Sequence, residues 1–486
     1  MAIIDGIDEI CDASVSSGID GVAGGPLYRS PRPEDIAREL LEEARESFDF
    51  PSPARSRRGK HQRHLGGAFD EDSGDLAEVG WAAILPAGGC PGVREALAPL
   101  LEHRRGQATG SGPGLFRVFE GPDGYRPGES RLDFLTRHGV GPGVGDPALM
   151  PRFLLLVGGP DEIPWEFQHD LALGHAVGRL SFDAPAHYAR YAERVVAIET
   201  EGRETPRRAA FFAPRHPEDR TSELICEYLA GPLAQAVAAK CPTWSIESLV
   251  GAEATREKLL RWLAGESGAS FLFAACHGVG FPCGDPLQRG CQGALLCADS
   301  AGPAVWRGPV PKEHFLNAAA VGDGARPPAF CFFFACHGAG TPRLTSYPEP
   351  GQEGCKARRQ LAPEPLAAEL PRRLLSLPEG SLAVVGHIER SFCYSFLWPQ
   401  TGPQIGVFQV ALRRLLAGVP VGAAFRSFPE RYAELAMDIA SLREAIDYGA
   451  PPDLALLGRL QTALTDARGY AILGDPAVRM RVAGAS

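Results

Sequence analysis

The sequence predicts an α/β fold in which a mostly parallel β-sheet is sandwiched between helices. Two observations carry this prediction. Short, nearly continuous apolar runs recur along the chain, and amphipathic helical stretches separate them. Strands that are apolar on both faces are typical of parallel sheets, because helices cover both sides of such a sheet. No repeat with a period of about 20–50 residues is apparent, so a solenoid is not expected.

The apolar runs give the predicted strands in chain order, which are residues 80–87, 152–159, 175–182, 208–214, 270–278, 329–338 and 381–388. Helical spacing predicts helices at residues 33–47, 93–105, 187–201, 222–238, 403–418 and 430–449. The final segment, 470–482, is expected to return a strand to the edge of the sheet.

At 486 residues the chain is too long for one typical hydrophobic core, so several domains are expected. Residues 1–76 read as an accessory N-terminal region with a basic, polar stretch at 52–67, which we interpret as a solvated linker. Residues 77–205 are predicted to form a smaller α/β subdomain. Residues 206–486 are predicted to form the main domain, with C-terminal helices and a closing strand.

Composition excludes several classes of function. The net charge of −10 argues against a general nucleic-acid binder, and no apolar run is long enough to span a membrane. The first residues, MAIIDGIDEICDASV, carry acids where a signal peptide needs a basic start, so we expect a cytoplasmic protein. Without a secretory signal, the 12 cysteines are expected to be free thiols, either packed in the core or reactive.

The reactive candidates lie in a repeated tetrapeptide. Two predicted strands end in Ala-Cys-His-Gly, at residues 275–278 and 335–338. Because the carboxyl ends of parallel strands meet at one edge, a histidine from one strand and a cysteine from the other would form a nucleophilic pair. A thiolate attacks a carbonyl, and an imidazole moves the proton. The duplication leaves open which cysteine and which histidine act.

The chain resembles the caspase-like (clan CD) cysteine peptidases, most of all their bacterial gingipain and CHAT-type branch. In caspases a strand ending in His-Gly is followed by a strand ending in Ala-Cys-x-Gly. Here His277-Gly278 is followed by Ala335-Cys336-His337-Gly338, although Phe334 stands where caspases have glutamine. Residues 153–199 look like a gingipain stretch with an Ile-Pro pair and a Gly-Arg strand, and 474–482 resembles the closing strand of CHAT domains.

The resemblance covers roughly residues 150–482, and it implies a caspase-like main domain preceded by a smaller gingipain-like subdomain. It makes Cys336 the nucleophile and His277 the acid/base. The backbone N–H groups of Gly278 and Cys336 would form the oxyanion hole. The implied activity is that of a cysteine endopeptidase acting on protein or peptide substrates.

For the substrate pocket, the resemblance points to Asp170, whose carboxylate would select arginine at P1, the residue before the cleaved bond. Glu389 is a second candidate for this pocket. Arg390 keeps open a preference for acidic residues, and Phe392 is expected to wall the pocket. Residues 387–392 are expected to pair with an extended substrate as an added strand.

Three other readings remain at this point. The Arg-rich stretch 52–67 and the loop 287–290 (LQRG) suggest a zymogen that is cleaved by itself or by an activating protease. A zinc site could use Cys276, His277, Cys283, Cys291 and Cys297, although their spacing is unlike the CxxC pairs of structural zinc sites. A non-enzymatic caspase-like scaffold is the other alternative. We expect no cofactor, no nucleic-acid partner and no membrane association.

Overall fold

The structure is a computed structural model that describes residues 16–28, 32–46, 74–109, 114–141, 143, 145–201, 204–347, 358–399 and 401–482. The predicted linker at 52–67 lies outside these residues. No helix of the described ranges is both long and apolar enough to cross a bilayer.

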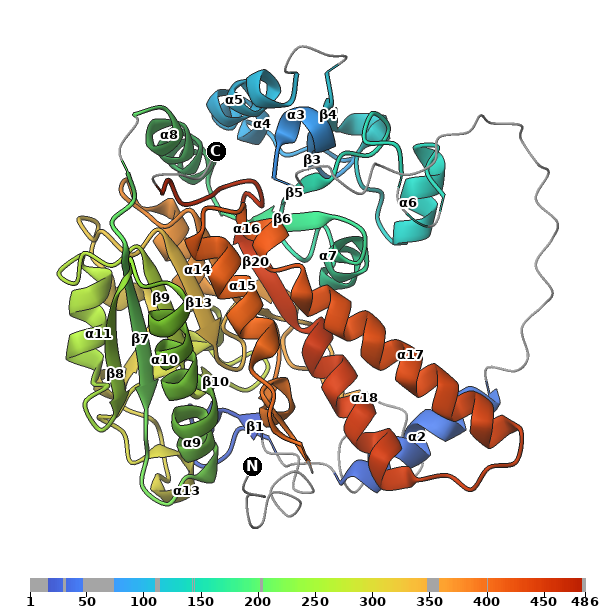
Figure 1. Ribbon diagram of the computed structural model, residues 1–486, viewed down its shortest axis with the longest axis vertical. Coiled ribbons are helices and arrows are strands. Elements are labelled where there is room, and N and C mark those ends of the chain that lie inside the picture. The colour runs from blue at the N-terminus through green and yellow to red at the C-terminus, as the bar shows by residue number, and fades with distance from the viewer. Residues whose placement is uncertain are drawn as a thin grey trace.

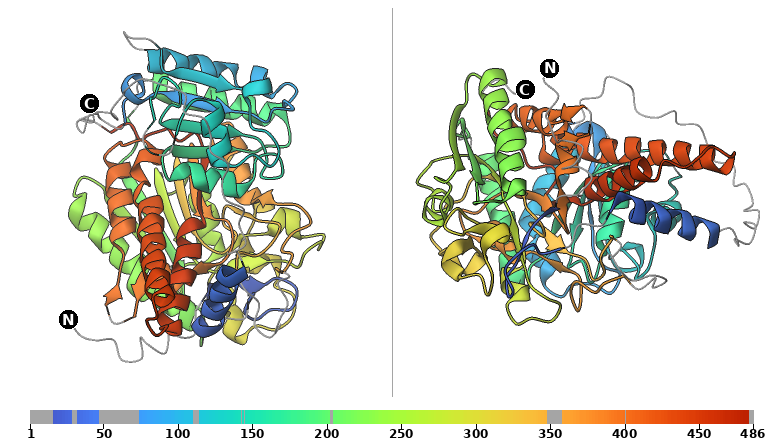
Figure 2. Two further views of the ribbon diagram at one scale, coloured as in Figure 1. Left: turned by 90° about the vertical axis from the view of Figure 1, so that its right-hand side faces the viewer. Right: turned by 90° about the horizontal axis from the view of Figure 1, so that it is seen from below.

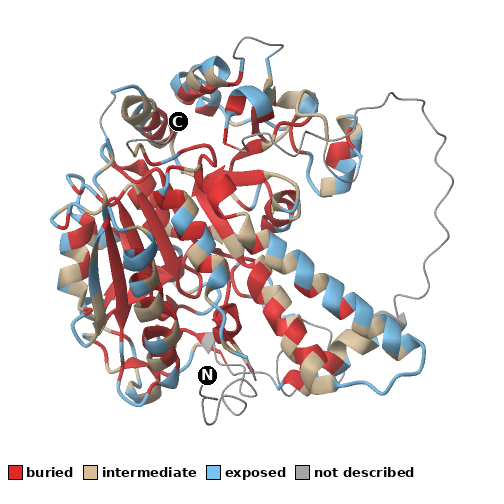
Figure 3. Cartoon of the chain, in the orientation of Figure 1, coloured by how far each residue is buried: buried red, intermediate tan, exposed pale blue. Residues whose placement is uncertain are grey.

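A ten-stranded mixed sheet forms the centre of the molecule, in the order β4-β3-β5-β6-β20-β16-β13-β9-β7-β8 (Figure 1). Seven of these strands come from the apolar runs and β20 from the final predicted segment, and the burial colours of Figure 3 show the sheet interior as buried. The fold class predicted from the sequence is confirmed. The ten strands are β3 (Trp81–Ile84), β4 (Phe116–Phe119), β5 (Phe153–Val157), β6 (Ala176–Leu180), β7 (Arg208–Pro214), β8 (Ser245–Gly251), β9 (Phe271–Ala275), β13 (Phe330–Phe334), β16 (Ala383–His387) and β20 (Tyr470–Gly474).

The closing strand β20 was predicted to lie at the edge of the sheet, and this prediction is wrong. It lies inside the sheet, antiparallel to β16 and parallel to β6, where Leu473 pairs with Arg179. The other neighbouring pairs of this sheet are parallel. The true edge strands, β4 and β8, were not predicted, because their half-exposed faces carry polar residues among the apolar ones.

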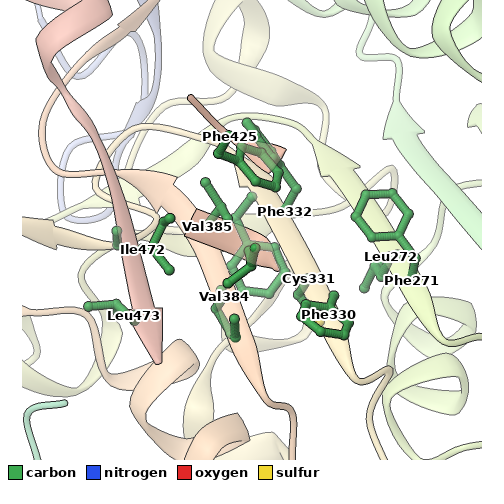
Figure 4. Close-up of a cluster of buried hydrophobic side chains, with 14 of the residues drawn as sticks. Phe271, Leu272, Phe330, Cys331, Phe332, Val384, Val385, Phe425, Ile472 and Leu473 are labelled. Carbon is green, nitrogen blue, oxygen red and sulfur yellow. The ribbon is translucent and has the colours of Figure 1, made fainter. Parts of the chain in front are cut away.

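Aromatic side chains show how the helices cover the sheet. Phe211, Phe273 and Phe332 are register partners on β7, β9 and β13, so they share one face. On this face Phe332 contacts Phe408 of α15 (Gly406–Leu416), which lies beside α10 (Gly231–Lys240). The adjacent Phe212 points to the other face and contacts α11 (Arg256–Leu263). Figure 4 shows the apolar core around Phe332, Phe425 and Val385.

Further helices pack around the sheet and beyond it. The predicted helix at 93–105 is divided into α4 (Val93–Ala96) and α5 (Ala98–Thr109), and a π-helical turn at Ile225–Ala230 separates α9 from α10. Helix α18 packs against both α17 and α2, as Figure 2 shows. The remaining α-helices are α2 (Pro33–Glu46), α3 (Leu76–Val79), α6 (Arg131–Arg137), α7 (Trp165–Ala172), α8 (Pro185–Thr200), α9 (Arg220–Leu224), α12 (Gln288–Cys291), α13 (Gly302–Val305), α14 (Glu369–Ser376), α16 (Val421–Ala424), α17 (Ser427–Asp447) and α18 (Leu454–Arg468).

The described parts of the N-terminal region are built into the main body. Its short strand β1 (Ser16–Ser17) pairs with β17 (Ser391–Phe392), and β2 (Ile19–Asp20) pairs with β10 (Gly278–Gly280). Helix α2 lies along α18, where a side chain at Gly458 would meet the Pro33 carbonyl at 1.7 Å. The division at residue 205 stays a prediction, and the strands on either side of it belong to one sheet.

A buried charge network ties the residue that follows β20 to β3, α5 and α8. Asp475, directly after β20, accepts hydrogen bonds from Arg104 Nε at 2.7 Å and Trp81 Nε1 at 3.0 Å. Arg104 also donates to Glu199 at 2.6 and 2.8 Å. Burial works against the charge on Arg104, but the two carboxylates outweigh it and raise the pKa of the guanidinium. These bonds hold α5 and α8 against the closing strand.

We predict that Asp475→Asn lowers the free energy of unfolding by about 3 kcal/mol, because a buried guanidinium loses one of its two counter-charges. Urea denaturation measures the change. The matched control is Glu102→Gln, which removes the exposed partner of Arg105 and should leave stability nearly unchanged. Equal effects of the two substitutions would contradict this role for the network.

Candidate active site

The register of two parallel strands brings the predicted cysteine and histidine together. In the pairing of β9 with β13, Phe334 lies opposite Ala275. Each strand ends at that residue, so His277 and Cys336 both follow two positions later at the same edge of the sheet. Gly278 packs so closely behind Cys336 that a side chain there would meet the Cys336 carbonyl oxygen at 1.9 Å.

Both side chains face the same N-terminal dipeptide. The Oγ of Ser17 lies 3.5 Å from the Sγ of Cys336, and the backbone N–H of Gly18 donates to Nδ1 of His277 at 2.8 Å. A side chain at Gly18 would lie 3.4 Å from the Cys336 Sγ. Cys336 is 0% exposed and His277 1% exposed. Residues 16–18 therefore cover the two candidate catalytic groups.

The sequence analysis missed a third group, Asp219. Its Oδ2 lies 2.6 Å from Nε2 of His277, and its carboxylate also caps α9 by accepting from the Ser222 backbone N–H at 3.0 Å. Asp219 follows β7, the strand next to β9, so the rule about the carboxyl ends of strands could have found it. The arrangement is a cysteine, a histidine and an orienting carboxylate.

The electrostatics of the site follow from these contacts. Burial acts to raise the pKa of Asp219, but the charge and hydrogen bond of His277 outweigh it, so the carboxylate's pKa is lowered. Neighbouring His216, with its ring centre 5.6 Å from that of His277, has its pKa lowered to about 4 by burial and so stays neutral near pH 7. Asp219 is thus the charged partner of the His277 imidazole.

The thiol of Cys336 is covered in this state. Burial raises its pKa, against hydrogen bonds from Ser17 and Ser391 that act to lower it. The Ser391 backbone N–H donates to the Sγ at 3.3 Å, and the hydroxyls of Ser17 and Ser391 contact each other. The raised pKa keeps the thiol protonated, the form that does not attack carbonyls.

The structure places two of the four predicted pocket residues side by side, because Glu389 lies 3.7 Å from Arg390 Nε. The carboxylate of Glu389 accepts from the Thr345 hydroxyl at 2.6 Å and the Ser346 N–H at 2.9 Å. The guanidinium of Arg390 lies 4.0 Å from the ring centre of Tyr28. Phe392 packs on Tyr347 in the cluster beside α18, and Asp170 of α7 accepts from Arg468 at 2.9 Å. Their roles in substrate binding stay predictions.

The cysteines of the zinc alternative are dispersed. The Sγ of Cys291 contacts Asn317 at 3.2 Å, Cys283 is exposed, and His277 is held by Asp219 and Gly18. Within the residues that the structure describes, no group of three or more His, Cys, Asp or Glu side chains could hold a metal ion.

Comparison with known proteins gives structural neighbours alone. No family model and no curated protein sequence matches the chain. A solved structure described as a protease is 12% identical with a TM-score of 0.45, covering 85% of this chain and 81% of its own. The Arg-specific cysteine proteinase gingipain R is 11% identical (TM-score 0.42, 82% and 78% covered).

A third neighbour is the complex of the RgpB pro- and mature domains from Porphyromonas gingivalis. It is 10% identical with a TM-score of 0.41, covering 82% of this chain and 79% of its own. The structural neighbours are thus gingipain-like proteinases at low identity, and the CHAT-type part of the resemblance stays a prediction. Any function has to be argued from this chain's own residues.

We predict that Asp219→Asn lowers the free energy of unfolding by about 2 kcal/mol at pH 7, because a charge-assisted hydrogen bond becomes a neutral one. The pKa of Asp219 is lowered in the folded state. Its contribution is therefore present above the unfolded pKa of about 4 and is lost as the pH falls through the folded pKa.

Chemical denaturation of wild type and variant at pH 7 and pH 3 should show the difference shrinking at the lower pH. Asp75→Asn, at an exposed helix N-cap where the carboxylate accepts from Ala77, is the control. A stability difference that stays constant between the two pH values would contradict the pairing of Asp219 with His277.

Proposed function

We propose that the chain is a cysteine endopeptidase in which Cys336 is the nucleophile, His277 the acid/base and Asp219 the group that orients the histidine. One observation carries the proposal. The Cys336 thiol and the free side of the His277 imidazole contact one dipeptide, Ser17–Gly18, which runs through the site as an extended strand. A scissile peptide would have to lie in the same position.

The hydrogen bonds of His277 indicate which ring nitrogen carries the proton in the neutral imidazole. Nδ1 accepts from Gly18, so in the neutral ring the proton is on Nε2 and is donated to Asp219. Nδ1 therefore presents its lone pair to the groove. Asp219 stabilises the imidazolium that forms when this lone pair takes a proton.

The chemistry follows from that geometry. Nδ1 accepts the proton of the Cys336 thiol, and the thiolate forms a C–S bond to the substrate carbonyl carbon while the carbonyl π electrons move onto oxygen. When the tetrahedral intermediate collapses, the C–N bond breaks and the amine leaves with the proton from Nδ1. Water, deprotonated by Nδ1, then cleaves the thioester, releasing the carboxylic acid product and restoring the thiol.

The substrate backbone is proposed to bind as an added strand on residues 391–392. Ser17 pairs with Ser391 and Ser16 with Phe392 in antiparallel register. Such pairing gives affinity through main-chain hydrogen bonds and is independent of side chains. If a substrate pairs in the same register, its leaving amine would lie at the position of the Gly18 nitrogen, 2.8 Å from Nδ1, and would receive its proton there.

The same contacts support a latent enzyme. We call residues 16–28 the N-terminal hairpin, since β2 turns back through a bridge between Ile19 and Pro26. Its Ile19 is fully buried in an apolar cluster with Val279 and Phe281. Bound in this way, the hairpin fills the groove and takes the hydrogen-bonding site on His277 that catalysis needs.

Cleavage in the Arg-rich stretch 52–67 is the activation step we propose. While the chain is intact, the hairpin is tethered and its effective concentration at the groove is high. Once the tether is cut, the hairpin can dissociate. The protease would be another molecule or the enzyme itself. The second predicted cleavage loop, 287–290, is instead largely helix α12, whose Gln288 is buried and donates to the Phe281 and Leu361 carbonyls, so we do not propose cleavage there.

Both a basic and an acidic P1 side chain would find oppositely charged residues among the predicted pocket residues. A P1 arginine would have to displace the existing bonds of Asp170 to Arg468 or of Glu389 to Thr345. A P1 aspartate would instead meet Arg390. Peptides that differ only at P1 (Arg, Lys, Asp, Leu, Ala) separate these preferences.

We predict that Cys336→Ala and His277→Ala each lower kcat/KM on cleavable peptides by about 10³-fold or more, because nucleophile and base act as a unit. The matched control is Cys276→Ala, the same position in the duplicated tetrapeptide, which should keep most of the activity. Hydrolysis that persists in Cys336→Ala would contradict the assignment. A groove that stays inactive after the hairpin is displaced would favour the non-enzymatic scaffold.

We predict that Ile19→Asp activates the intact chain, since a charge in the apolar cluster expels the hairpin. Val22→Asp, on the exposed turn of the same hairpin, should leave the enzyme latent. Peptide hydrolysis gives one readout, and the rate of Cys336 alkylation by iodoacetamide, followed by mass spectrometry, gives another. Equal alkylation of Cys336 in wild type and Ile19→Asp would contradict the role of the hairpin.

A further inference from the structure

The last residue of the N-terminal hairpin, Tyr28, fills a pocket beside the nucleophile. Its phenol oxygen lies 2.6 Å from Nε2 of His337. The face of its ring lies 4.0 Å from the guanidinium of Arg390. The tyrosine is only 7% exposed, so ring and hydroxyl are both enclosed.

The walls of this pocket are held in place by other contacts. Nδ1 of His337 lies 2.9 Å from the Thr341 hydroxyl, and the His337 backbone N–H donates to the Glu389 carbonyl at 2.7 Å. His337 has a φ of 60°, a conformation that costs energy for a residue other than glycine. The surrounding structure therefore fixes the imidazole at the base of the pocket.

The residues around Tyr28 adjoin the candidate catalytic residues. His337 directly follows Cys336, and Arg390 directly precedes Ser391, whose N–H donates to the Cys336 Sγ at 3.3 Å. Both walls thus adjoin residues that the proposed mechanism uses. When the hairpin leaves the groove, Tyr28 leaves with it and the pocket opens to a substrate.

The charged residues around the pocket determine which kind of side chain it can bind. Arg390 and Arg359, with guanidinium groups 4.0 and 5.9 Å from the Tyr28 ring centre, repel a second cation. Glu389 lies 3.7 Å from Arg390 Nε and offsets its charge, which weakens the attraction for an added carboxylate. A neutral ring keeps the cation–π contact with the guanidinium without adding charge.

The Tyr28 hydroxyl also has a hydrogen-bonding partner in the pocket, the imidazole of His337. Burial lowers the pKa of His337 to about 3 and raises the pKa of Tyr28 well above its usual value, so both groups are neutral near pH 7. Nε2 of His337 can therefore exchange a neutral hydrogen bond with a phenol. A phenylalanine ring would leave this buried nitrogen without that partner.

From these contacts we propose that the pocket formed by His337, Arg390 and Arg359 is a substrate subsite that accepts a tyrosine side chain, with Tyr28 as its occupant in the latent chain. The inference rests on the proposed peptidase function and names the substrate class: proteins with a tyrosine at one fixed position near the cleaved bond.

A binding experiment tests the pocket directly in the full chain. Tyr28→Ala leaves a hole of the shape of the ring, and thermal unfolding is followed with p-cresol, toluene, acetate or methylguanidinium added. We expect p-cresol to raise the melting temperature most and toluene less, with no shift from acetate or methylguanidinium. Tyr448→Ala, at a position 86% exposed, is the control and should show no shift with any probe. A larger shift with acetate or methylguanidinium, or no shift at all, would overturn the inference.

A kinetic experiment tests the substrate class. The full-length Ile19→Asp variant is given peptides in which tyrosine, phenylalanine, aspartate, arginine or alanine is moved through the positions around the cleaved bond. At one position tyrosine should raise kcat/KM by about 30-fold over alanine and about fivefold over phenylalanine. Arg390→Lys in the same background should raise KM for the tyrosine peptide selectively, because it removes the planar guanidinium that faces the ring.

The outcomes separate the two proposals. Hydrolysis that depends on Cys336 but shows no tyrosine preference at any position overturns the subsite and leaves the peptidase in place. No Cys336-dependent hydrolysis of any peptide overturns the peptidase, and the substrate class falls with it.

Discussion

The in-register pairing of β9 with β13 sets the relative position of the candidate nucleophile and the candidate base. Phe334 lies opposite Ala275, so Cys336 and His277 leave the sheet at the same level. A slip of one residue would turn one of the two side chains to the opposite face of the sheet, because side chains alternate along a strand. The tight contact of Gly278 with the Cys336 carbonyl adds a second constraint, since no side chain fits between the two loops.

In the proposed peptidase, the two nitrogens of His277 would link catalysis to latency. Asp219 holds Nε2 and thereby leaves the lone pair of Nδ1 facing the groove, where a peptidase needs a base. Gly18 takes that lone pair in the structure, and Ser17 covers the thiol. One segment thus occupies both groups at once, with hydrogen bonds that a substrate would replace.

The hairpin backbone occupies the place proposed for the substrate backbone, and Tyr28 likewise occupies the place proposed for a substrate side chain. Its walls come from the two loops that also supply the nucleophile and the strand for the substrate backbone. The left-handed conformation of His337 is retained because bonds to Thr341 and to the Glu389 carbonyl hold it. Strain next to a nucleophile is typical of functional sites. If the proposals hold, the hairpin mirrors a substrate in its backbone pairing, and its tyrosine lies where a substrate side chain would bind.

Much of this protein could be predicted from local patterns. The continuous apolar runs determined the interior strands, because only a sheet covered on both faces buries such runs, and the Cys-His-Gly ends marked the reactive edge. The edge strands β4 and β8 escaped prediction because a half-exposed strand mixes polar and apolar residues. The position of β20 inside the sheet escaped it because strand order depends on long-range packing, which no local pattern records.

Local sequence patterns likewise predict only part of the candidate active site. The sequence by itself determined the chemical groups, a thiol and an imidazole at the ends of two strands. Only the tertiary structure decided that Asp219 orients the imidazole, that Ser17 and Gly18 lie across the groove, and that Tyr28 lies against His337 and Arg390. These partners are distant in the chain, and they meet because the folded sheet and its loops fix their separation in space.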